Sequence, residues 1–254
     1  MIPAEARSAA QKAGDLIRSA RHAVVLTGAG ISTPSGIPDF RSQNTGLWMK
    51  DDPMQVASLS AFTYRPNVFF NWLRPLAQKM WQANPNAAHI GLAELEKAGA
   101  IQAVITQNID GLHQAAGSQN VLEVHGSART ASCKVCRISY PADQFRAAFL
   151  EGGIPYCPVC GAILKPDIVL FEEMLPADVW TKAEWHCSQA DVMLVVGSAL
   201  EVVPAAGLPY TALEHGARLI INTISSTYLD EQAAILLPYD VVEIVPLIKS
   251  AVIG

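Results

Sequence analysis

Residues 23–30 read AVVLTGAG, a short apolar run that ends in two glycines with one alanine between them. A nearly continuous run of aliphatic residues is typical of a strand that is covered on both faces. Glycines directly after such a strand allow a tight turn in which backbone amides approach a pyrophosphate. The stretch therefore predicts a buried strand followed by a dinucleotide-binding turn. An ordinary turn stays open as an alternative, because Thr33 stands where the GxGxxG motif has its third glycine.

Four later runs share this apolar character, at residues 101–106, 191–198, 217–222 and 240–245. Segments of helical composition lie between the runs, such as 4–20 and 86–98, and Gly99 provides a C-terminal cap for the second. Alternation of strands and helices favours an α/β fold with a Rossmann-like, doubly wound parallel sheet. We therefore predict that the five apolar runs are strands of one sheet.

The chain has 254 residues, of which half are hydrophobic and 16% are charged, and its formal net charge is −5. This composition excludes an intrinsically disordered chain, which combines low hydrophobicity with high charge. The mild acidity argues against a general nucleic-acid binder, since such proteins carry a basic surface. No apolar run reaches the roughly 18–20 residues of a membrane span, and charged residues interrupt the N-terminus. We therefore expect a cytoplasmic protein without membrane contact.

Four of the five cysteines form two CxxC pairs, Cys133 with Cys136 and Cys157 with Cys160. Two such pairs complete a tetrahedron of thiolates, which is typical of a structural zinc site with no position open for water. A redox-active CxxC, or two unrelated pairs, is the alternative interpretation. We predict one structural Zn²⁺ ion and no metal catalysis, and we expect Cys187 in the core.

Two stretches interrupt the alternation of strands and helices. Residues 42–85 are rich in aromatics and favour a loop followed by short helices, whereas residues 127–165 contain the paired cysteines and favour an inserted zinc-binding module. The remaining ranges, 1–41, 86–126 and 166–254, then make up the Rossmann-like domain. The prediction is thus a Rossmann-like domain with a smaller inserted zinc-binding and helical domain.

Polar residues follow the run at 101–106, where Gln107, Asn108 and Asp110 stand at the carboxyl end of the expected strand. Ligands of doubly wound sheets bind at that edge, although Asn and Asp are also common in ordinary turns. His125 ends a further short run, just before the cysteine pairs. A lone histidine is often structural, but a neutral imidazole at such a junction is also able to take a proton from a sugar hydroxyl.

Taken together, these motifs resemble the sirtuins, the Sir2 family of NAD-dependent protein deacylases. The matching motifs are GAGISTPSGIPDFR (28–41), TQNID with GLH behind it (106–113), VHG (124–126), the four cysteines, KPDIVLFEEMLP (165–176), GSALEVVPAA (197–206), IN (221–222) and YD (239–240). They occur in the order and at the spacing of the family and cover nearly the whole chain. Their variants look like those of a bacterial or archaeal sirtuin made of the catalytic core.

The resemblance implies a role for each matching residue. It implies NAD binding by Gly28, Ala29, Gly30, Ile37, Asp39, Phe40, Arg41, Gln107, Asn108, Ile109, Asp110, Ser198, Asn222 and Asp240. Asn108 and Asp110 would act in catalysis within the nicotinamide pocket, and His125 would be the general base. The substrate peptide would be flanked by Val169, Leu170, Phe171, Glu201, Val202 and Val203.

The implied reaction transfers the acyl group of an acylated lysine to ADP-ribose, with NAD as co-substrate and with release of nicotinamide and O-acyl-ADP-ribose. Acylated lysine side chains of proteins are the expected partners, and we expect a monomer. The chain departs from the family at Glu172, where sirtuins usually have glycine, and we predict that this charge favours basic residues beside the modified lysine. Leu73 and Leu76 stand where desuccinylating sirtuins have tyrosine and arginine, which predicts an apolar acyl tunnel.

Three alternatives stay open at this point. A sirtuin-like mono-ADP-ribosyltransferase would transfer ADP-ribose to a protein side chain. A non-catalytic NAD or ADP-ribose sensor would bind the dinucleotide without releasing nicotinamide. A zinc-ribbon nucleic-acid binder is disfavoured by the acidity and by the few basic residues between the cysteine pairs.

Overall fold

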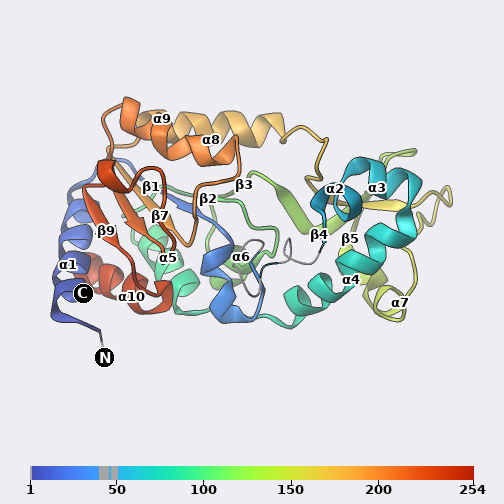
Figure 1. Ribbon diagram of the computed structural model, residues 1–254, viewed down its shortest axis with the longest axis horizontal. Helices are drawn as coiled ribbons and strands as arrows, with labels where there is room; N and C mark the ends of the chain where they lie inside the picture. Colours follow the sequence, from blue (N-terminus) through green and yellow to red (C-terminus); the bar gives the residue numbers. More distant parts are fainter. Residues whose placement is uncertain (1, 40–45, 47–50) are drawn as a thin grey trace.

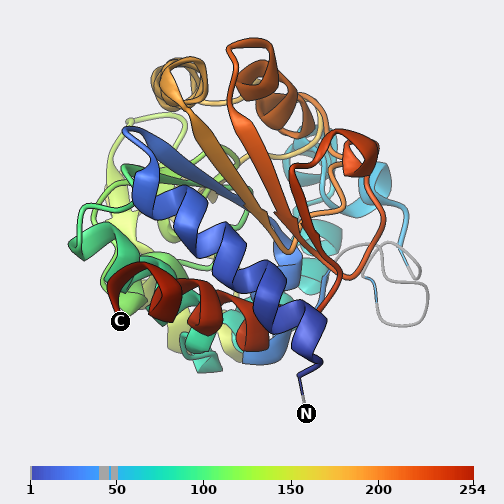
Figure 2. The same cartoon turned by 90° about the vertical axis from the view of Figure 1, so that its left-hand side faces the viewer.

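The computed structural model describes residues 2–39, 46 and 51–254. Its main feature is a six-stranded sheet in the order β3-β2-β1-β7-β8-β9, in which all neighbouring strands are parallel (Figures 1 and 2). The strands are β1 (Ala23–Thr27), β2 (Ala103–Thr106), β3 (Val121–Glu123), β7 (Val192–Val196), β8 (Arg218–Asn222) and β9 (Ile235–Leu237). The parallel α/β sheet expected from the sequence is confirmed.

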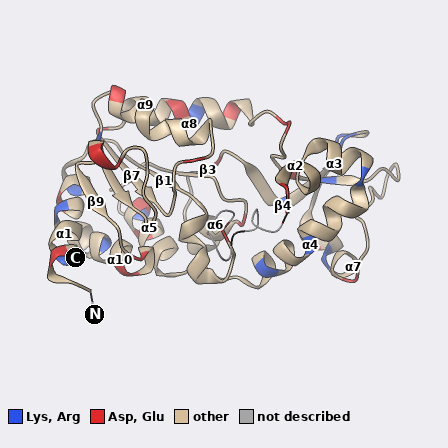
Figure 3. Cartoon of the chain, viewed as in Figure 1, with Lys and Arg blue, Asp and Glu red and all other residues tan. Residues whose placement is uncertain are grey.

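Helices cover both faces of this sheet (Figure 2). They are α1 (Ala4–Ser19), α5 (Ala87–Lys97), α6 (Leu112–Ala116), α8 (Ala177–Gln189), α9 (Leu208–Glu214) and α10 (Val241–Ile253). Val25 packs into a cluster with α1, α5 and α10, whereas Val24 and Leu26 pack into a cluster with α8 and α9. Because successive side chains of a strand point to opposite faces, a strand covered on both sides is apolar throughout. Accordingly, β1, β2 and β7 carry no charged residue (Figure 3).

A smaller part of the chain lies beyond one end of the large sheet (Figure 1). It contains an antiparallel sheet of β4 (Gly126–Cys133), β5 (Ser139–Pro141) and β6 (Leu164–Ile168), together with α2 (Pro53–Val56), α3 (Leu59–Tyr64), α4 (Pro66–Gln82) and α7 (Arg146–Leu150). With 17 residues, α4 is longer than the short helices expected here. The predicted domain boundaries stay a prediction.

Aromatic side chains form the core of this smaller part. Phe62 from α3, Phe69, Phe70 and Trp81 from α4, and Phe149 from α7 meet edge to face, with ring centroids 5.0–6.1 Å apart. Edge-to-face pairs of this kind stabilise a core beyond the area that they bury. The aromatic-rich sequence thus supplies the contact between the helices and the cysteine-containing segment.

Polar side chains mark where several helices begin. Asp52 caps α2, Ser58 caps α3, and Asn86 caps α5, each by accepting backbone N–H groups of the first turn. His89 completes a capping box with Asn86. Five short 3-10 helices are also present in the described ranges: η1 (Ala29–Ile31), η2 (Thr33–Ser35), η4 (Ala142–Phe145), η5 (Ala205–Gly207) and η6 (Asp230–Gln232).

The expectation of a strand at residues 240–245 is wrong, because this run begins the helix α10. Asp240 caps that helix by accepting a hydrogen bond from the amide of Val242 over 3.1 Å. The buried residues of α10 repeat with the period of one helix face: Val241, Ile244, Val245 and Ile248. Short apolar runs fit a strand or a buried helix equally well, which explains the error. Within the described ranges, no helix combines the length and the apolarity needed to cross a bilayer.

Candidate active site and metal centre

The glycine loops after β1 and β7 pack directly against each other. Gly28 N donates to Val196 O over 3.1 Å, and Gly30 N donates to Gly197 O over 2.8 Å. A Cβ atom on Gly30 would lie 2.7 Å from Gly197 O, and one on Gly28 would lie 2.8 Å from the Cβ of Ser198. Both glycines are therefore required by the contact between the two loops, in addition to any ligand that they approach.

Gln107 connects three neighbouring strand ends. Its backbone amide donates to Thr27 O at the end of β1, and its side-chain Nε2 donates to the hydroxyl of Ser198 over 3.0 Å, just after β7. Gln107 itself follows β2. The expected residues at the carboxyl edge of the sheet, where ligands of such folds bind, thus lie together.

Asn108 and Asp110 meet on the hydroxyl of Ser32. Asn108 Nδ2 donates to Ser32 Oγ and to Gly28 O, each over 3.1 Å, and Ser32 Oγ donates to Asp110 Oδ2 over 2.7 Å. Leu112 N donates to the other carboxylate oxygen of Asp110 over 2.9 Å. Burial raises the pKa of Asp110, and the bonds from Leu112 and Ser32 oppose that rise. Ser32 was not among the expected site residues, and its place in the GIS segment of the glycine loop was the available signal.

The imidazole of His125 has one nitrogen fixed and one available. Nδ1 lies 3.1 Å from the carbonyl oxygen of Gln107, so Nδ1 carries the proton and donates it. No described residue forms a hydrogen bond with Nε2, which leaves its lone pair available. Burial lowers the pKa of His125, and the bond to Gln107 opposes this effect. His125 is therefore a neutral base near pH 7.

Two further histidines, His89 and His113, are buried near the carboxyl edge of the large sheet, and burial keeps both rings neutral. His113 Nε2 donates to Thr27 Oγ1 over 2.9 Å, because that hydroxyl donates its own proton to Thr106 over 2.8 Å. Burial lowers the pKa of His113 to about 3 and that of His89 to about 4. Both rings are buried and pack edge to face with centroids 5.0 Å apart. Both rings therefore serve in packing, and His89 also completes the capping box of α5.

The segment 168–171 lies against His125 and against α3. Val169 N donates to His125 O over 2.8 Å. Phe171 N donates to Ala57 O over 3.1 Å, and Leu59 N donates to Phe171 O over 3.0 Å. The expected substrate strip is thus fixed by main-chain bonds between the two parts of the chain. On the other expected strip, Glu201 and Val203 are exposed and Val202 is half-buried.

The remaining expected cofactor residues are less closely grouped. Ile37 and Ile109 pack against the aromatic core around Phe62, while Asp39 is half-buried and Ala29 begins η1. Phe40 and Arg41 lie outside the described residues.

Asn222 and Asp240 both have structural partners. Asn222 is the last residue of β8 and is fully buried, and its Nδ2 donates to Leu237 O and Tyr239 O, each over 2.9 Å. Its Oδ1 is a buried acceptor without a hydrogen-bond partner among the described residues. Asp240 caps α10 through its carboxylate. Neither arrangement assigns these residues to a ligand by itself, and their cofactor roles stay a prediction.

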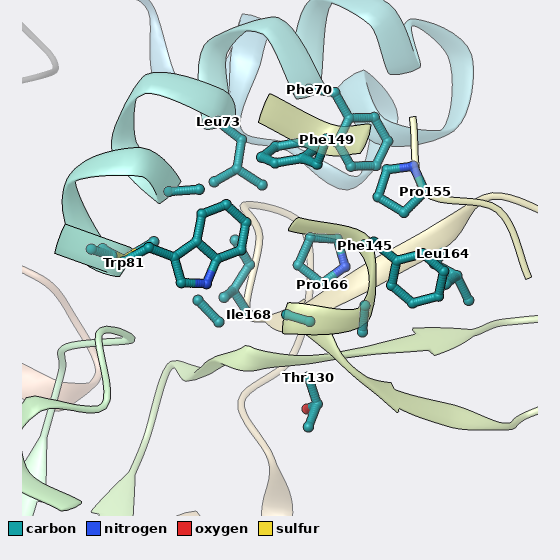
Figure 4. Close-up of a pocket in the computed structure, with 15 residues that line it drawn as sticks. Phe70, Leu73, Trp81, Thr130, Phe145, Phe149, Pro155, Leu164, Pro166 and Ile168 are labelled. Atoms are coloured by element: carbon teal, nitrogen blue, oxygen red, sulfur yellow. The ribbon is translucent and has the colours of Figure 1, made fainter. Parts of the chain in front are cut away.

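An apolar pocket lies between α4, α7 and the small sheet (Figure 4). Its walls include Phe70 and Leu73 from α4, Phe149 from α7 and Ile168 from β6. Leu73 is one of the two leucines at the positions that predict an apolar acyl tunnel. None of the described residues that line the pocket is charged, so they offer no partner for an acyl carboxylate.

The four paired cysteines converge on one point at the end of β4. Their Sγ atoms all lie within 4.8 Å of one another. Cys133 and Cys160 are 3.4 Å apart and Cys136 and Cys157 are 3.5 Å apart between sulfurs, which is too long for disulfides of ~2.05 Å. Zn–S bonds of ~2.3 Å put the sulfurs of a tetrahedron about 3.8 Å apart, so the set fits one zinc ion. Cys187 is fully buried in the core, as expected.

Comparisons with known proteins agree on one family. The model of the Sir2 family matches residues 28–204. The chain is 46% identical to an NAD-dependent protein deacylase 2 of Archaeoglobus fulgidus, over 87% of each chain. It is 44% identical to an NAD-dependent protein deacetylase of Caldivirga maquilingensis, over 96% of this chain and 94% of the relative.

Solved structures give the same result. A structure described as the basis for the mechanism and regulation of Sir2 enzymes has a TM-score of 0.90 and 42% identity, with 97% of this chain and 98% of that one covered. A Sir2 protein with a deacetylated p53 peptide and 3′-O-acetyl ADP-ribose has a TM-score of 0.88 and 40% identity, over 94% and 97% of the chains. The family model, the relatives and the fold together establish that this chain belongs to the Sir2 family.

Proposed function

We propose that this protein is an NAD-dependent protein-lysine deacylase, which transfers the acyl group to ADP-ribose and releases nicotinamide and O-acyl-ADP-ribose. The observation that carries this proposal is the double contact of Gln107. Its side chain binds Ser198 in one glycine loop, and its carbonyl binds Nδ1 of His125. Gln107 thereby fixes the position of the expected base, His125, relative to the expected dinucleotide site. The relatives named as deacylase and deacetylase support the same activity.

The glycine loops and the polar residues after β2 would hold NAD. Gly28, Gly30 and Ser198 lie in the two glycine loops at the carboxyl edge of the sheet, and Asn108 and Asp110 are fixed beside them by Ser32. The orphaned Oδ1 of Asn222 fits a ligand that donates a hydrogen bond at the same edge. When bound, NAD supplies a ribose carbon that accepts the acyl oxygen as nicotinamide leaves, and a ribose hydroxyl that becomes the acyl acceptor.

His125 would remove the proton from that hydroxyl. The carbonyl of Gln107 fixes the tautomer with Nδ1–H, so Nε2 holds the lone pair. A neutral base near pH 7 suits proton abstraction from a weakly acidic group, and such catalysis contributes roughly 10²–10⁴-fold. Asp110 and Asn108, held on Ser32, would supply a fixed carboxylate and a fixed amide to stabilise positive charge on bound NAD.

The substrate peptide would lie along the segment 168–171, beside His125. The hydrogen bond from Val169 N to His125 O places this segment next to the base. Pairing between main chains gives affinity with little demand on sequence. The acyl group would point toward the apolar surfaces of Leu73 and Ile168, which favours acetyl and alkyl groups over succinyl. The related structure with a deacetylated peptide supports a protein substrate.

Product analysis by mass spectrometry tests the proposal. Purified protein is incubated with NAD and a panel of acetyl-, butyryl- and succinyl-lysine peptides, alongside His125→Ala and the control His215→Ala, whose ring is exposed and bonds Thr211 O. We expect free lysine peptide and O-acyl-ADP-ribose from wild type and from His215→Ala, and at least a ~100-fold loss with His125→Ala. Absence of peptide-dependent nicotinamide release from the wild type would refute the proposal.

The same experiment separates the alternatives. ADP-ribose found on protein rather than on the acyl group would indicate a mono-ADP-ribosyltransferase. NAD binding without nicotinamide release would indicate a sensor. The monomeric state and the cytoplasmic location expected from the sequence stay predictions, which size-exclusion chromatography and cell fractionation test.

A further inference from the structure

A buried lysine lies directly below the segment 168–171. Only 4% of the Lys165 side chain is exposed. Its Nζ donates to Glu173 Oε2 over 2.7 Å, to Ile168 O over 2.8 Å and to Pro166 O over 3.1 Å. These three acceptors use all three donors of the ammonium group. Burial lowers the pKa of Lys165, and the hydrogen bond and charge of the Glu173 carboxylate oppose that effect.

Glu173 connects the same ion pair to the other end of the segment. Its Oε2 also accepts a hydrogen bond from Leu170 N over 3.1 Å, and its side chain is 15% exposed. Glu173 N in turn donates to Leu170 O over 3.0 Å, which closes a tight turn. The second carboxylate oxygen faces the more exposed Lys134 at 3.7 Å. One lysine and one glutamate thus hold the carbonyl of residue 168 and the amide of residue 170.

Val169 lies between the two fixed backbone groups, the carbonyl of Ile168 and the amide of Leu170, and it contacts the backbone of His125, the expected base. Val169 N donates to His125 O, and the Val169 carbonyl has no hydrogen-bond partner among the described residues. The ion pair therefore fixes a strand segment in which one carbonyl is left for a ligand, next to His125. Two charges in the interior are a weak source of stability, because desolvation offsets their attraction. Their geometric effect on the segment explains the arrangement better than a contribution to stability.

We propose that Lys165 and Glu173 are positioning residues, which set the distance of the substrate strip from His125 and so determine the affinity for the acylated peptide. The proposal rests on the proposed function, because it assumes that the peptide lies along residues 168–171. It assigns the pair no contact with the reacting atoms. The pair acts through the backbone of Ile168, Val169 and Leu170.

Graded variants of Glu173 test this role. Glu173→Gln keeps an acceptor for Leu170 N and for Lys165, whereas Glu173→Leu removes both. Lys165→Met removes the other half of the pair at similar volume. Lys249→Met is the matched control, since it breaks the Lys249–Glu94 ion pair of 3.1 Å between α10 and α5, in the large-sheet part. Fluorescence anisotropy of a labelled acetyl-lysine peptide gives the peptide Kd, and steady-state kinetics give KM for peptide and for NAD.

We expect Glu173→Leu and Lys165→Met to weaken peptide binding and raise peptide KM by about 10-fold or more. KM for NAD and zinc content are expected to stay close to those of Lys249→Met, and Glu173→Gln is expected to retain most of the affinity. Tm is expected to fall in Glu173→Leu and in Lys165→Met, because each leaves a buried charge without its partner. An unchanged peptide Kd in Glu173→Leu, or a parallel loss of NAD binding and zinc, would overturn the proposal. A wild type that binds acetyl-lysine peptide without turnover refutes the proposed function alone, and the Kd comparison still decides the role of the pair. A wild type that binds no such peptide overturns both.

Discussion

The hydroxyl of Ser32 donates a hydrogen bond to Oδ2 of Asp110 over 2.7 Å. Ser32 follows η1 in the loop after β1, and Asp110 follows β2. The same hydroxyl accepts a hydrogen bond from Asn108 Nδ2 over 3.1 Å. One serine therefore holds both polar residues that are expected in the nicotinamide pocket, without itself being expected there.

Replacement of Ser32 by alanine is predicted to damage the reaction more than the fold. Ser32→Ala removes the donor to a carboxylate, an interaction worth about 1.5–3 kcal/mol, and frees the amide of Asn108. We expect kcat/KM for NAD to fall roughly 10- to 100-fold. The control is Ser188→Ala, which loses a hydroxyl bond to Trp185 O on α8, in a helix on the outside of the sheet. Equal activity of the two variants would contradict the prediction.

Asp110, for which we propose a role in catalysis, is predicted to reduce the stability of the folded protein. Burial raises its pKa above the ordinary value of 3.8, so the folded protein holds this proton more tightly than the unfolded chain does. The penalty is absent below the unfolded pKa, grows as pH rises through the folded pKa, and is complete above it. Asp110→Asn should therefore raise Tm by a few degrees at pH 7.5 and have less effect near pH 4. Activity should fall about 100-fold or more.

Thermal unfolding at both pH values, with and without the substitution, measures this effect. The side-chain amide oxygen that Asp110→Asn introduces would still accept the bond from Leu112 N, so the local geometry has a substitute for the lost carboxylate oxygen. A lower Tm for Asp110→Asn at pH 7.5 would show that the hydrogen bonds of the carboxylate outweigh its burial.

His125 is predicted to keep its activity in mildly acidic solution. Burial lowers its pKa below the ordinary value of 6.5, so the neutral form, which would act as the base, persists as pH falls through that value. The acidic limb of kcat/KM for the acyl peptide should therefore have its midpoint below pH 6.5. Single-turnover rates between about pH 5 and 8 provide the measurement. A midpoint clearly above the ordinary histidine value would argue against His125 as the group that titrates.

The sequence predicts well those elements whose residue types fit only one structural setting, such as a strand buried on both faces or a metal site. The run 23–26 is apolar on both faces because α1 and α10 cover one side and α8 and α9 cover the other. The cysteine pairs are equally specific, because thiolates at that spacing have few structural uses. By contrast, the apolar residues at 240–245 fit the period of a strand and that of a buried helix equally well. Only the packing of α10 against α1 and α5 decides in favour of the helix.

The contacts within the site depend on segments far apart in the sequence. Ser32 meets Asp110 because β1 pairs with β2 in a register that puts Thr27 opposite Thr106. The burial of Lys165 has no local signal, because a charged side chain is ordinarily expected at the surface, and only the turn at Glu173 provides its partner. No pattern in the local sequence predicts the contact of Ser32 with Asp110 or that of Lys165 with Glu173.

Removal of zinc is predicted to unfold the smaller part of the chain. Binding of a structural zinc ion by thiolates contributes about 10–16 kcal/mol, and β4 and β6 lead directly to the cysteine pairs. Cys157→Ser should lose one zinc per chain and almost all activity, whereas Cys187→Ala, in the core of the large sheet, should keep its zinc. Zinc content by mass spectrometry and far-UV circular dichroism make the comparison. Full activity of a zinc-free Cys157→Ser protein would contradict a structural role.

Glu172 is predicted to influence which peptides bind, through a charge at a backbone position that favours glycine. Its φ of +74° lies in the left-handed region, and its carboxylate accepts a hydrogen bond from Ser60 N over 2.8 Å at the start of α3. The carboxylate thus links the end of the segment 168–171 to α3 of the smaller part. Glu172 nevertheless remains exposed to solvent beside that segment. Exposed charge pairs are worth about 0.2–1 kcal/mol, so peptides with Lys or Arg beside the acyl-lysine should react up to about 5-fold faster than peptides with Asp or Glu.

Two variants separate the charge of Glu172 from its hydrogen bond. Glu172→Gln keeps an acceptor for Ser60 N but loses the charge, so we expect the preference for basic peptides to disappear while Tm stays unchanged. Glu172→Gly loses both, although it relieves a left-handed backbone that costs a non-glycine residue about 1–2 kcal/mol. Glu184→Gln, exposed on α8, controls for the loss of one negative charge elsewhere. If the preference for basic peptides is absent in the wild type, or survives in Glu172→Gln, the charge of Glu172 does not select the substrate. The carboxylate then serves only to attach the segment 168–171 to α3.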